Sequence, residues 1–285
     1  MKSLSLRTWV EINRKALRHN AEDFFRLISQ STRLMAVVKS NAYGHGLVQV
    51  AQELVVLPQF VSKGWFGVDS IVEGLRLRRE GITNPILVLG YTLPARLEDA
   101  AREKISISVS NFDALAALQS SRVRPAMHVK LDTGMHRQGF LERDIPSLVK
   151  RLAKYRIAPE GIFTHFASAK DMSYPTYTLA QLSSFKKMIA QIKDAKFTDM
   201  IFHAAATGGT LLFSDAHLDM VRIGMGLYGY FPSLESRIQH NAPGLNPMPV
   251  LSWKTLVVET KRIPKNSFVG YDLTEKVHRA TRIAV

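Results

Sequence analysis

The chain has 285 residues, no cysteine and a formal net charge of +14 at neutral pH. Its length suits one large α/β barrel or two smaller domains, and the lack of cysteine excludes disulfides, thiolate metal sites and a cysteine nucleophile. The basic residues are scattered and form no recognised nucleic-acid-binding motif. We therefore expect a solvated basic surface and no nucleic-acid partner, with salt-sensitive DNA binding as the alternative that the charge leaves open.

The beginning of the chain reads M-K-S-L-S-L-R-T-W-V-E-I, which lacks the apolar core of a signal peptide. No apolar run approaches the length needed to cross a bilayer. We therefore expect a soluble, cytoplasmic protein without a membrane partner.

Apolar runs alternate with helical periods along most of the chain. Asn13 is the predicted N-cap of a helix that precedes the first buried strand. Strands are predicted over residues 34–38, 65–68, 85–90, 105–109, 127–131, 161–166, 201–205 and 220–224. Helices are predicted over residues 47–56, 71–79, 93–103, 113–119, 145–155 and 177–195, with a short helix through Leu211 and Leu212. Eight strands separated by helices predict an α/β fold, a (β/α)8 TIM-type barrel.

The pattern changes after the eighth strand. Residues 231–249 are rich in Pro, Asn, Gly and Ser and show no helical period, so the helix before the first strand is expected to close the ring. From Val250 the sequence reads as β structure and ends in the apolar run R-I-A-V. We therefore expect a barrel over residues 1–242, a linker and partial C-terminal β domain over residues 243–285, and a C-terminally truncated chain.

The stretch L-M-A-V-V-K-S-N-A-Y-G-H-G, from Leu34 to Gly46, is the candidate chemical centre. Lys39 closes an apolar strand, and a polar turn with two glycines follows it. An amine at the carboxyl end of a barrel strand can form a Schiff base. A lone lysine in such a place is more often a solvated side chain, so this assignment depends on the other motifs.

Further polar residues share this position, at or just beyond the carboxyl ends of predicted strands, where barrel enzymes hold their active sites. They are Lys130, Asp132, His136, Arg137, His165, Thr207 and Arg222. The T-G-G that begins at Thr207 opens a helix, and R-I-G-M-G follows the next strand, so both segments offer backbone amides to an anion. An amine beside a phosphate cradle suggests pyridoxal phosphate.

Four motifs resemble those of alanine racemases, and the similarity covers the whole chain in order. A-V-V-K-S-N-A-Y-G-H-G is similar to the cofactor-lysine signature, and K-L-D-T-G-M-H-R-Q-G to the motif of the fifth strand. V-R-I-G-M-G-L-Y-G resembles the motif of the eighth strand, and F-V-G-Y-D-L-T the stretch with the catalytic tyrosine. The resemblance implies a homodimeric isomerase that interconverts L-alanine and D-alanine with pyridoxal 5'-phosphate and supplies D-alanine for peptidoglycan.

The resemblance also implies a role for single residues. Lys39 would hold the cofactor as an aldimine and act as base on one face of the substrate, and Tyr271 from the partner subunit would act on the other face. The residues implied to hold the phosphate are Tyr43, Thr207, Gly208, Gly224 and Met225. Arg222 would face the pyridine nitrogen, where a permanent cation disfavours ring protonation and makes the ring a weaker electron sink.

Three further residues complete the set that the resemblance implies. His165 would hydrogen-bond the catalytic tyrosine, which needs help because a free phenol titrates near pH ~10. Arg137 would orient the cofactor and the substrate carboxylate, and Lys130 matches a lysine that many members carbamylate to position that arginine. His45 and His203 are interpreted as structural.

The sequence departs from the family pattern around the tyrosine. Asp272 stands where glycine is usual and Glu275 where an aromatic residue is usual, and a carboxylate beside a phenol opposes its ionisation. The family's second active-site tyrosine, from later in the C-terminal domain, has no counterpart. The alternatives are a truncated homologue with little turnover and a non-catalytic pyridoxal-phosphate-binding barrel. A decarboxylase is disfavoured, because such enzymes place a carboxylate where Arg222 would lie.

Overall fold

The computed structural model describes residues 6–193, 197, 199–240 and 242–285. The chain forms two compact units: one is Asn13–Val250, and the other combines Met1–Ile12 with Leu251–Val285. The domain boundary expected at residue 243 remains a prediction. The first compact unit runs on to Val250, whose N–H donates to the Tyr228 carbonyl (3.2 Å) and whose carbonyl accepts from Asn13 N (2.8 Å).

The larger unit is a barrel of eight parallel strands in the order β8-β7-β6-β5-β4-β3-β2-β9. A parallel bridge between Ala206 and Arg222 links β8 to β9 and completes the ring. The strands are β2 (Arg33–Val37), β3 (Gly64–Val68), β4 (Ile86–Val88), β5 (Ile105–Val109), β6 (Met127–Lys130), β7 (Gly161–Phe163), β8 (Ile201–His203) and β9 (Met220–Ile223). The expected (β/α)8 barrel is confirmed, and each strand lies within its predicted range or one residue ahead of it.

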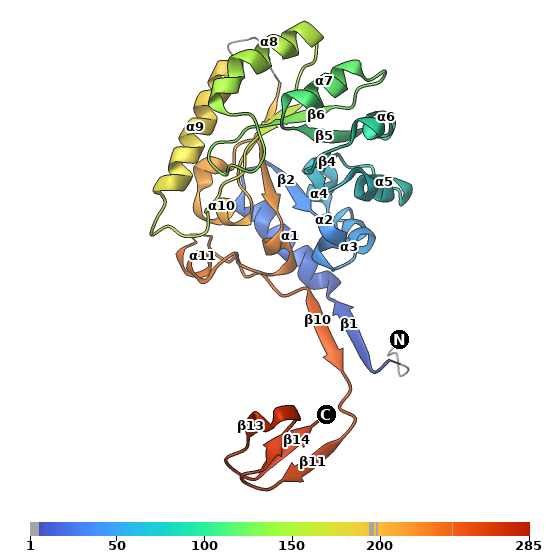
Figure 1. Cartoon of the computed structure of the whole chain (residues 1–285), viewed down its shortest axis with the longest axis vertical. Helices are drawn as coiled ribbons and strands as arrows, with labels where there is room; N and C mark the ends of the chain where they lie inside the picture. Colours follow the sequence, from blue (N-terminus) through green and yellow to red (C-terminus); the bar gives the residue numbers. More distant parts are fainter. Residues whose placement is uncertain (1–5, 194–196, 198, 241) are drawn as a thin grey trace. The chain divides into compact units, whose positions relative to one another are not determined.

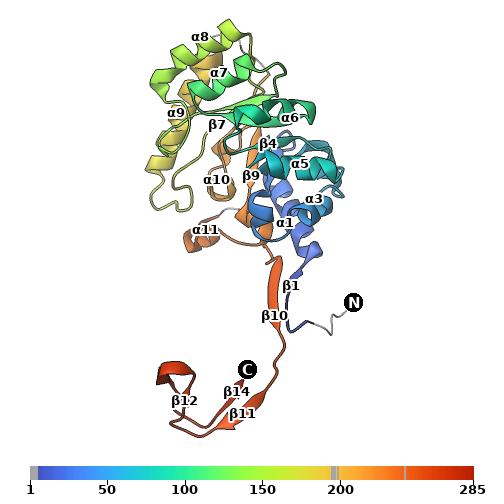
Figure 2. The same cartoon turned by 45° about the vertical axis from the view of Figure 1, so that its right-hand side comes forward.

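Helices follow one another around the outside of these strands (Figures 1 and 2). The helices are α1 (Arg14–Leu27), α2 (Lys39–Tyr43), α3 (Leu47–Leu54), α4 (Pro58–Lys63), α5 (Ile71–Arg79), α6 (Leu97–Arg102), α7 (Phe112–Ser120), α8 (Ile145–Tyr155), α9 (Thr176–Lys193), α10 (Thr207–Leu212) and α11 (Leu234–Gln239). Short 3₁₀ turns are η1 (Pro94–Arg96), η2 (Glu142–Asp144), η3 (Ser214–Ala216), η4 (Met225–Tyr228) and η5 (Tyr271–Leu273). Residues 194 and 195 of the predicted long helix lie outside the described residues. None of the described helices combines the length and apolar character needed to span a membrane.

Helix α1 closes the ring as expected. The Asn13 side chain caps it by accepting a hydrogen bond from Ala16 N (3.0 Å). The helix packs against α3 and against η4, which directly follows β9. Fully buried Asn20 donates to the Leu227 and Met248 carbonyls and accepts from Met248 N, so one amide side chain ties the segment after β9 to α1.

The prediction that residues 231–249 contain no helix is wrong. Helix α11 lies in this segment and packs against α10 (Figure 2). Ser233 Oγ accepts a hydrogen bond from Ser236 N (3.0 Å), and Ser236 Oγ accepts one from Ser233 N (3.1 Å). This reciprocal capping satisfies two backbone donors at the helix start, so the helix forms without strong apolar periodicity.

The smaller unit consists of antiparallel strand pairs. Strand β1 (Thr8–Ile12) pairs with β10 (Leu251–Thr255), β11 (Thr260–Ile263) with β14 (Thr281–Ala284), and β12 (Phe268–Val269) with β13 (Glu275–Lys276). The β structure expected after Val250 is therefore confirmed. The sequence reasoning assigned β1 to the barrel, but its pairing with β10 places it in this unit.

Candidate active site

Lys39 stands where β2 ends, at the start of an unusual turn. Ser40, Asn41, Ala42 and Tyr43 all adopt left-handed helical geometry, with φ between 54° and 55°. This conformation costs a residue with a side chain about 1–2 kcal/mol. Four such residues in a row persist only where the surroundings hold them, and strain of this kind is concentrated at functional sites.

Side chains on neighbouring segments hold the turn. Asn41 Oδ1 accepts from Leu47 N (2.9 Å) at the start of α3, and Asn41 N donates to Glu73 Oε1 (3.3 Å) on α5. The other oxygen of Glu73 accepts from Asp69 N (2.8 Å) just after β3. The ring of His45 contacts the Ala42 carbonyl through Nδ1 (3.0 Å). These hydrogen bonds thus connect the turn after β2 to the segment after β3. The contact of His45 with the Ala42 carbonyl also holds the turn.

The Lys39 amine faces an open part of the barrel mouth. Its Nζ lies 3.9 Å from Asp69 Oδ1, and its side chain is 40% exposed. An accessible amine can react with a carbonyl compound that enters the mouth.

Arg222 on β9 is buried inside the barrel, 3% exposed. Its NH2 group donates to the Thr164 and Ala204 carbonyls, both at 2.7 Å. Its NH1 group donates to His203 Nδ1 (2.8 Å), and NH2 also contacts His165 Nδ1 (3.1 Å). Burial lowers the pKa of Arg222 to about 9, so the guanidinium still carries its charge at neutral pH.

His165, just after β7, is a neutral imidazole. Burial and the nearby Arg222 charge, followed by Arg137, Lys130 and Lys39, lower its pKa to about 3. Both protons of Arg222 NH2 point toward carbonyls, and the contact to His165 Nδ1 is longer. A guanidinium has no acceptor, so its approach to Nδ1 favours the tautomer with the ring proton on Nε2.

Lys130 at the end of β6 belongs to the same cluster of cations. Burial lowers its pKa to about 8, with further lowering from Arg137 and Arg222 that Asp132 partly opposes. Its Nζ donates to Gln138 Oε1 (3.3 Å). With a pKa of about 8, roughly a tenth of this amine is unprotonated at pH 7, and that is the form that reacts with carbon dioxide.

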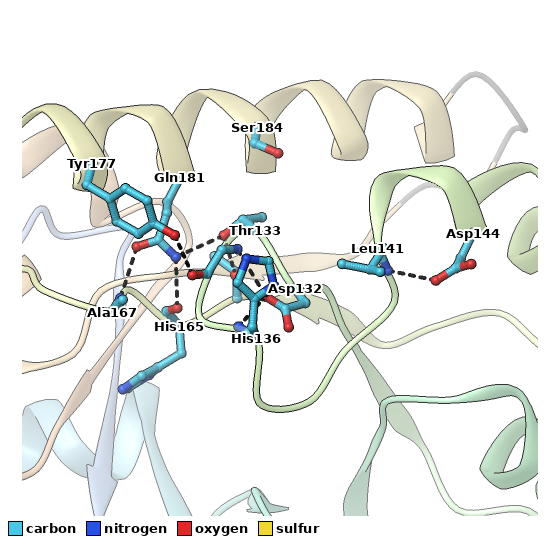
Figure 3. Close-up of polar contacts among 12 residues, drawn as sticks. Asp132, Thr133, His136, Leu141, Asp144, His165, Ala167, Tyr177, Gln181 and Ser184 are labelled. Carbon is cyan, nitrogen blue, oxygen red and sulfur yellow. Dashed lines mark hydrogen bonds and ion pairs between the residues drawn. The ribbon is translucent and has the colours of Figure 1, made fainter.

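The loop after β6 carries Arg137, which is exposed. Asp132 Oδ1 shapes the loop by accepting from the N–H groups of Gly134 and His136, both at 3.0 Å. Helix α9 supports it, since Tyr177 Oη donates to the Gly134 carbonyl at 2.6 Å (Figure 3). Hydrogen bonds with Asp132 and Tyr177 therefore hold the backbone of the loop from which Arg137 extends.

Several of the residues implied to bind a phosphate are closely packed. Thr207 Oγ1 accepts from Gly224 N (3.2 Å) and Gly226 N (3.3 Å). A Cβ atom on Gly224 would lie 2.9 Å from the Tyr43 hydroxyl oxygen, and one on Gly208 would lie 2.1 Å from the Ala169 carbonyl.

The amides of residues 207–209 precede the first helical hydrogen bond of α10, from Thr210 N to Ala206 O. A hydroxyl, a phenol and backbone amides at this place fit a phosphate group, and so do the four cations nearby.

Two of the predicted site residues, Met225 and Tyr271, are exposed. Met225 is 44% exposed in η4, where its backbone rather than its side chain adjoins Gly224. Tyr271 belongs to the smaller unit, at the start of η5, and is 94% exposed. Asp272 beside it has a left-handed backbone, with φ 56°.

The sequence reasoning missed the groups behind Arg222. His203 was interpreted as structural, yet its ring accepts directly from the guanidinium. His128 and Glu160 continue the contacts from His203 and were not singled out. The available signal was the placement of histidines within strands that line a barrel, where every polar side chain needs a partner.

The site therefore has a lysine at the end of the first barrel strand, a cationic interior, and a hydroxyl with backbone amides at the seventh and eighth strand ends. This combination is typical of a (β/α)8-barrel enzyme that acts on an anionic, carbonyl-bearing compound.

Comparison with known proteins gives the family. Residues 12–232 match the model of the alanine racemase N-terminal domain. The alanine racemase of Leptospira interrogans serovar copenhageni is 33% identical, with 98% of this chain and 72% of that protein aligned. That of Symbiobacterium thermophilum is 36% identical over 97% and 72% of the two chains. The structure of Clostridium difficile alanine racemase matches with a TM-score of 0.84 at 30% identity, covering 99% of this chain and 73% of that one. The chain belongs to the alanine racemase family of isomerases.

Proposed function

We propose that this chain interconverts L-alanine and D-alanine with pyridoxal 5'-phosphate, as a cytoplasmic homodimer that supplies D-alanine for peptidoglycan. The observation that carries the cofactor assignment is that the Lys39 amine and the hydroxyl and amides around Thr207 stand at the same, carboxyl-terminal end of the barrel strands. When bound, pyridoxal phosphate supplies an aldehyde that condenses with amines and a ring that stabilises negative charge on an amino acid's α-carbon.

Lys39 and Tyr271 are the two bases in this proposal. Lys39 Nζ holds the cofactor and moves a proton on one face of the α-carbon, and the partner subunit's Tyr271 moves a proton on the opposite face through its hydroxyl oxygen. Racemisation requires removal and return of a proton on opposite faces.

His165 prepares the tyrosine in this arrangement. Its Nδ1 is occupied by Arg222, so its Nε2–H is the group that donates to a phenol oxygen. Donation to the phenolate favours the ionised form and lets the phenol act as a base nearer neutral pH.

Arg222 limits the electron demand of the cofactor ring. Its two terminal nitrogens are held by two carbonyls and His203, and the charged guanidinium is proposed to face the pyridine nitrogen. Two adjacent cations repel, so Arg222 in this position would disfavour protonation of that nitrogen and would weaken the ring as an electron sink when the cofactor is bound.

Arg137 and Lys130 are proposed to recognise the substrate carboxylate and the cofactor. Free Lys130 and Arg137 repel each other, as the lowered pKa of Lys130 reflects. Carbamylation would replace the ammonium charge by an anion and convert this repulsion into attraction, which would hold Arg137 in place.

The Tyr271→Phe variant tests the two-base assignment. We expect racemisation in both directions to fall by about 10²–10⁴-fold, because one face of the α-carbon loses its proton-transfer group. In deuterated water one enantiomer should still exchange its α-hydrogen with retained configuration, since Lys39 remains. Chiral chromatography and mass spectrometry of the recovered alanine measure both effects.

Tyr155→Phe, at the end of α8, is the matched control and should racemise alanine at the normal rate. Full racemisation by Tyr271→Phe would exclude Tyr271 as a base. Absence of racemisation and of exchange in the cofactor-loaded parent chain would reject the proposed function.

A further inference from the structure

A row of hydrogen bonds crosses the barrel interior behind Arg222. Arg222 NH1 contacts His203 Nδ1 at 2.8 Å, and His203 Nε2 contacts His128 Nδ1 at 2.8 Å. His128 Nε2 then contacts Glu160 Oε2 at 3.2 Å. Both imidazoles are fully buried, 0% exposed. Strands β6 and β8 are not neighbours in the sheet, so the histidine contact passes through the inside of the barrel.

The direction of every bond in this row follows from its first member. A guanidinium has only donors, so His203 Nδ1 accepts and the proton of the neutral ring lies on Nε2. That proton is donated to His128 Nδ1, which leaves the His128 proton on Nε2. The last bond is donated to the Glu160 carboxylate. Burial lowers the pKa of both histidines, in agreement with neutral rings.

The two ends of the row lie at opposite edges of the sheet. His203 is the last residue of β8, at the edge where the active site lies, whereas Glu160 immediately precedes β7. Glu160 has a 34% exposed side chain and lines a cavity of about 340 Å³. Among the residues of this row, Glu160 is thus the one with access to solvent, and it lies at the end of the barrel opposite Lys39.

The side chains of His128 and His203 are closely packed, which restricts the movement of both rings. A Cβ atom on Gly161 would lie 2.4 Å from His128 Nδ1, so the glycine next to Glu160 makes room for the ring. Trp65 meets His128 edge-on at 5.5 Å, and Phe163 stacks on His203 at 4.9 Å. Neither ring can turn without displacing an aromatic neighbour.

We propose that Glu160, His128 and His203 form a relay of positioning residues that orients Arg222 from the opposite end of the barrel. The consequence for catalysis rests on the proposed function, in which Arg222 faces the cofactor ring. The Arg222 donor and the Glu160 acceptor, at the two ends of the row, favour the same donor direction in both imidazoles, so the carboxylate reinforces His203 as an acceptor for Arg222. In the reversed direction, two N–H donors would face each other between His203 and Arg222, which is unfavourable.

The first test reads the histidine tautomers in the cofactor-free protein by ¹⁵N-resolved NMR. We expect His203 and His128 both to carry their proton on Nε2. In Glu160→Gln, which keeps the size and removes the charge, the resonances of both rings should move. In Glu160→Asp, which keeps the carboxylate, the resonances of both rings should move back toward their positions in the parent chain. A proton on His203 Nδ1, or unchanged ring resonances in Glu160→Gln, would overturn the relay.

The second test measures turnover. We expect Glu160→Gln to lower kcat for alanine racemisation by about 2- to 30-fold, with a smaller change in KM, because the effect reaches the reaction through Arg222. Glu160→Asp should recover part of kcat. The matched control is Glu103→Gln, a glutamate of similar exposure (39%) outside the relay, which should behave like the parent. An unchanged kcat in Glu160→Gln would contradict the catalytic consequence, whereas loss of all activity in the parent chain would reject the proposed function and leave the tautomer test valid.

Discussion

Replacing Lys39 by alanine is expected to lower the rate of alanine racemisation by at least about 10³-fold. The variant removes the amine that is proposed both to attach the cofactor and to transfer a proton at the α-carbon. The other nearby amine, Lys130, stands at the end of β6 and donates to Gln138, so it is not placed to substitute for Lys39. Initial rates in both directions, measured with saturating cofactor, check this expectation.

The fold should survive this substitution. The Lys39 side chain is partly exposed and makes one long ion pair, so its removal should change the free energy of unfolding by no more than about 0.5 kcal/mol. Lys187→Ala is the matched control, because that lysine pairs with Glu142 on the outside of the barrel. A Lys39→Ala protein with near-normal rates would show that another group carries the chemistry.

Acidification is expected to lower the stability of the barrel from pH ~6.5 downward, before most of its carboxylates are protonated. Three histidines close to Arg222, namely His128, His165 and His203, have pKa values below the usual 6.5, and that of His165 is lowered to about 3. Burial is the largest cause for each, and the Arg222 charge adds to it. All three rings therefore resist protonation in the folded state.

The sign of the effect follows from proton binding. Above pH ~6.5 the rings are neutral in both states, so stability is fully present. Below that pH the unfolded chain binds protons that the folded chain does not, and each histidine removes about 1.4 kcal/mol per pH unit until its folded pKa is reached. For His165 this loss continues to about pH 3, and the lowered pKa values of His128 and His203 add losses of the same sign.

Circular dichroism during an acid titration at constant ionic strength measures this loss. His203→Asn, which keeps an acceptor for Arg222, should reduce the slope by about one proton. His136→Gln is the control, since that side chain is 73% exposed and should leave the slope unchanged. Stability independent of pH between 7 and 4 would show that the three rings are protonated as easily in the folded as in the unfolded chain.

The barrel was predictable because its signals are local. Helix α8 was expected over residues 145–155 and has those bounds, because its apolar face and its proline at the start act within the segment. Helix α5 likewise has its predicted bounds, with Ser70 as N-cap. Helix α11 was missed because two serines cap it reciprocally, a signal that periodicity does not register. The pairing of β1 with β10 joins segments more than 230 residues apart, and no local pattern indicates it.

In the candidate site, too, positions set by local signals were predictable, whereas contacts between distant segments were not. The positions of Lys39, Arg222 and Thr207 at strand ends followed from the order of the strands. The left-handed turn after Lys39 could not be predicted, because Asn41 and Glu73 hold it through contacts made only in the folded chain. The partners of Arg222 were equally hidden, since His203, His128 and Glu160 come from three separate segments.

Borohydride reduction of the chain loaded with pyridoxal phosphate, followed by peptide mapping, tests the assignment of Lys39 most directly. Reduction fixes the cofactor permanently on the amine with which it has condensed. We expect the label on the peptide that contains Lys39, and no label on the peptide that contains Lys130. A label on another lysine, or no label after incubation with the cofactor, would contradict the assignment of Lys39 as the chemical centre of this barrel.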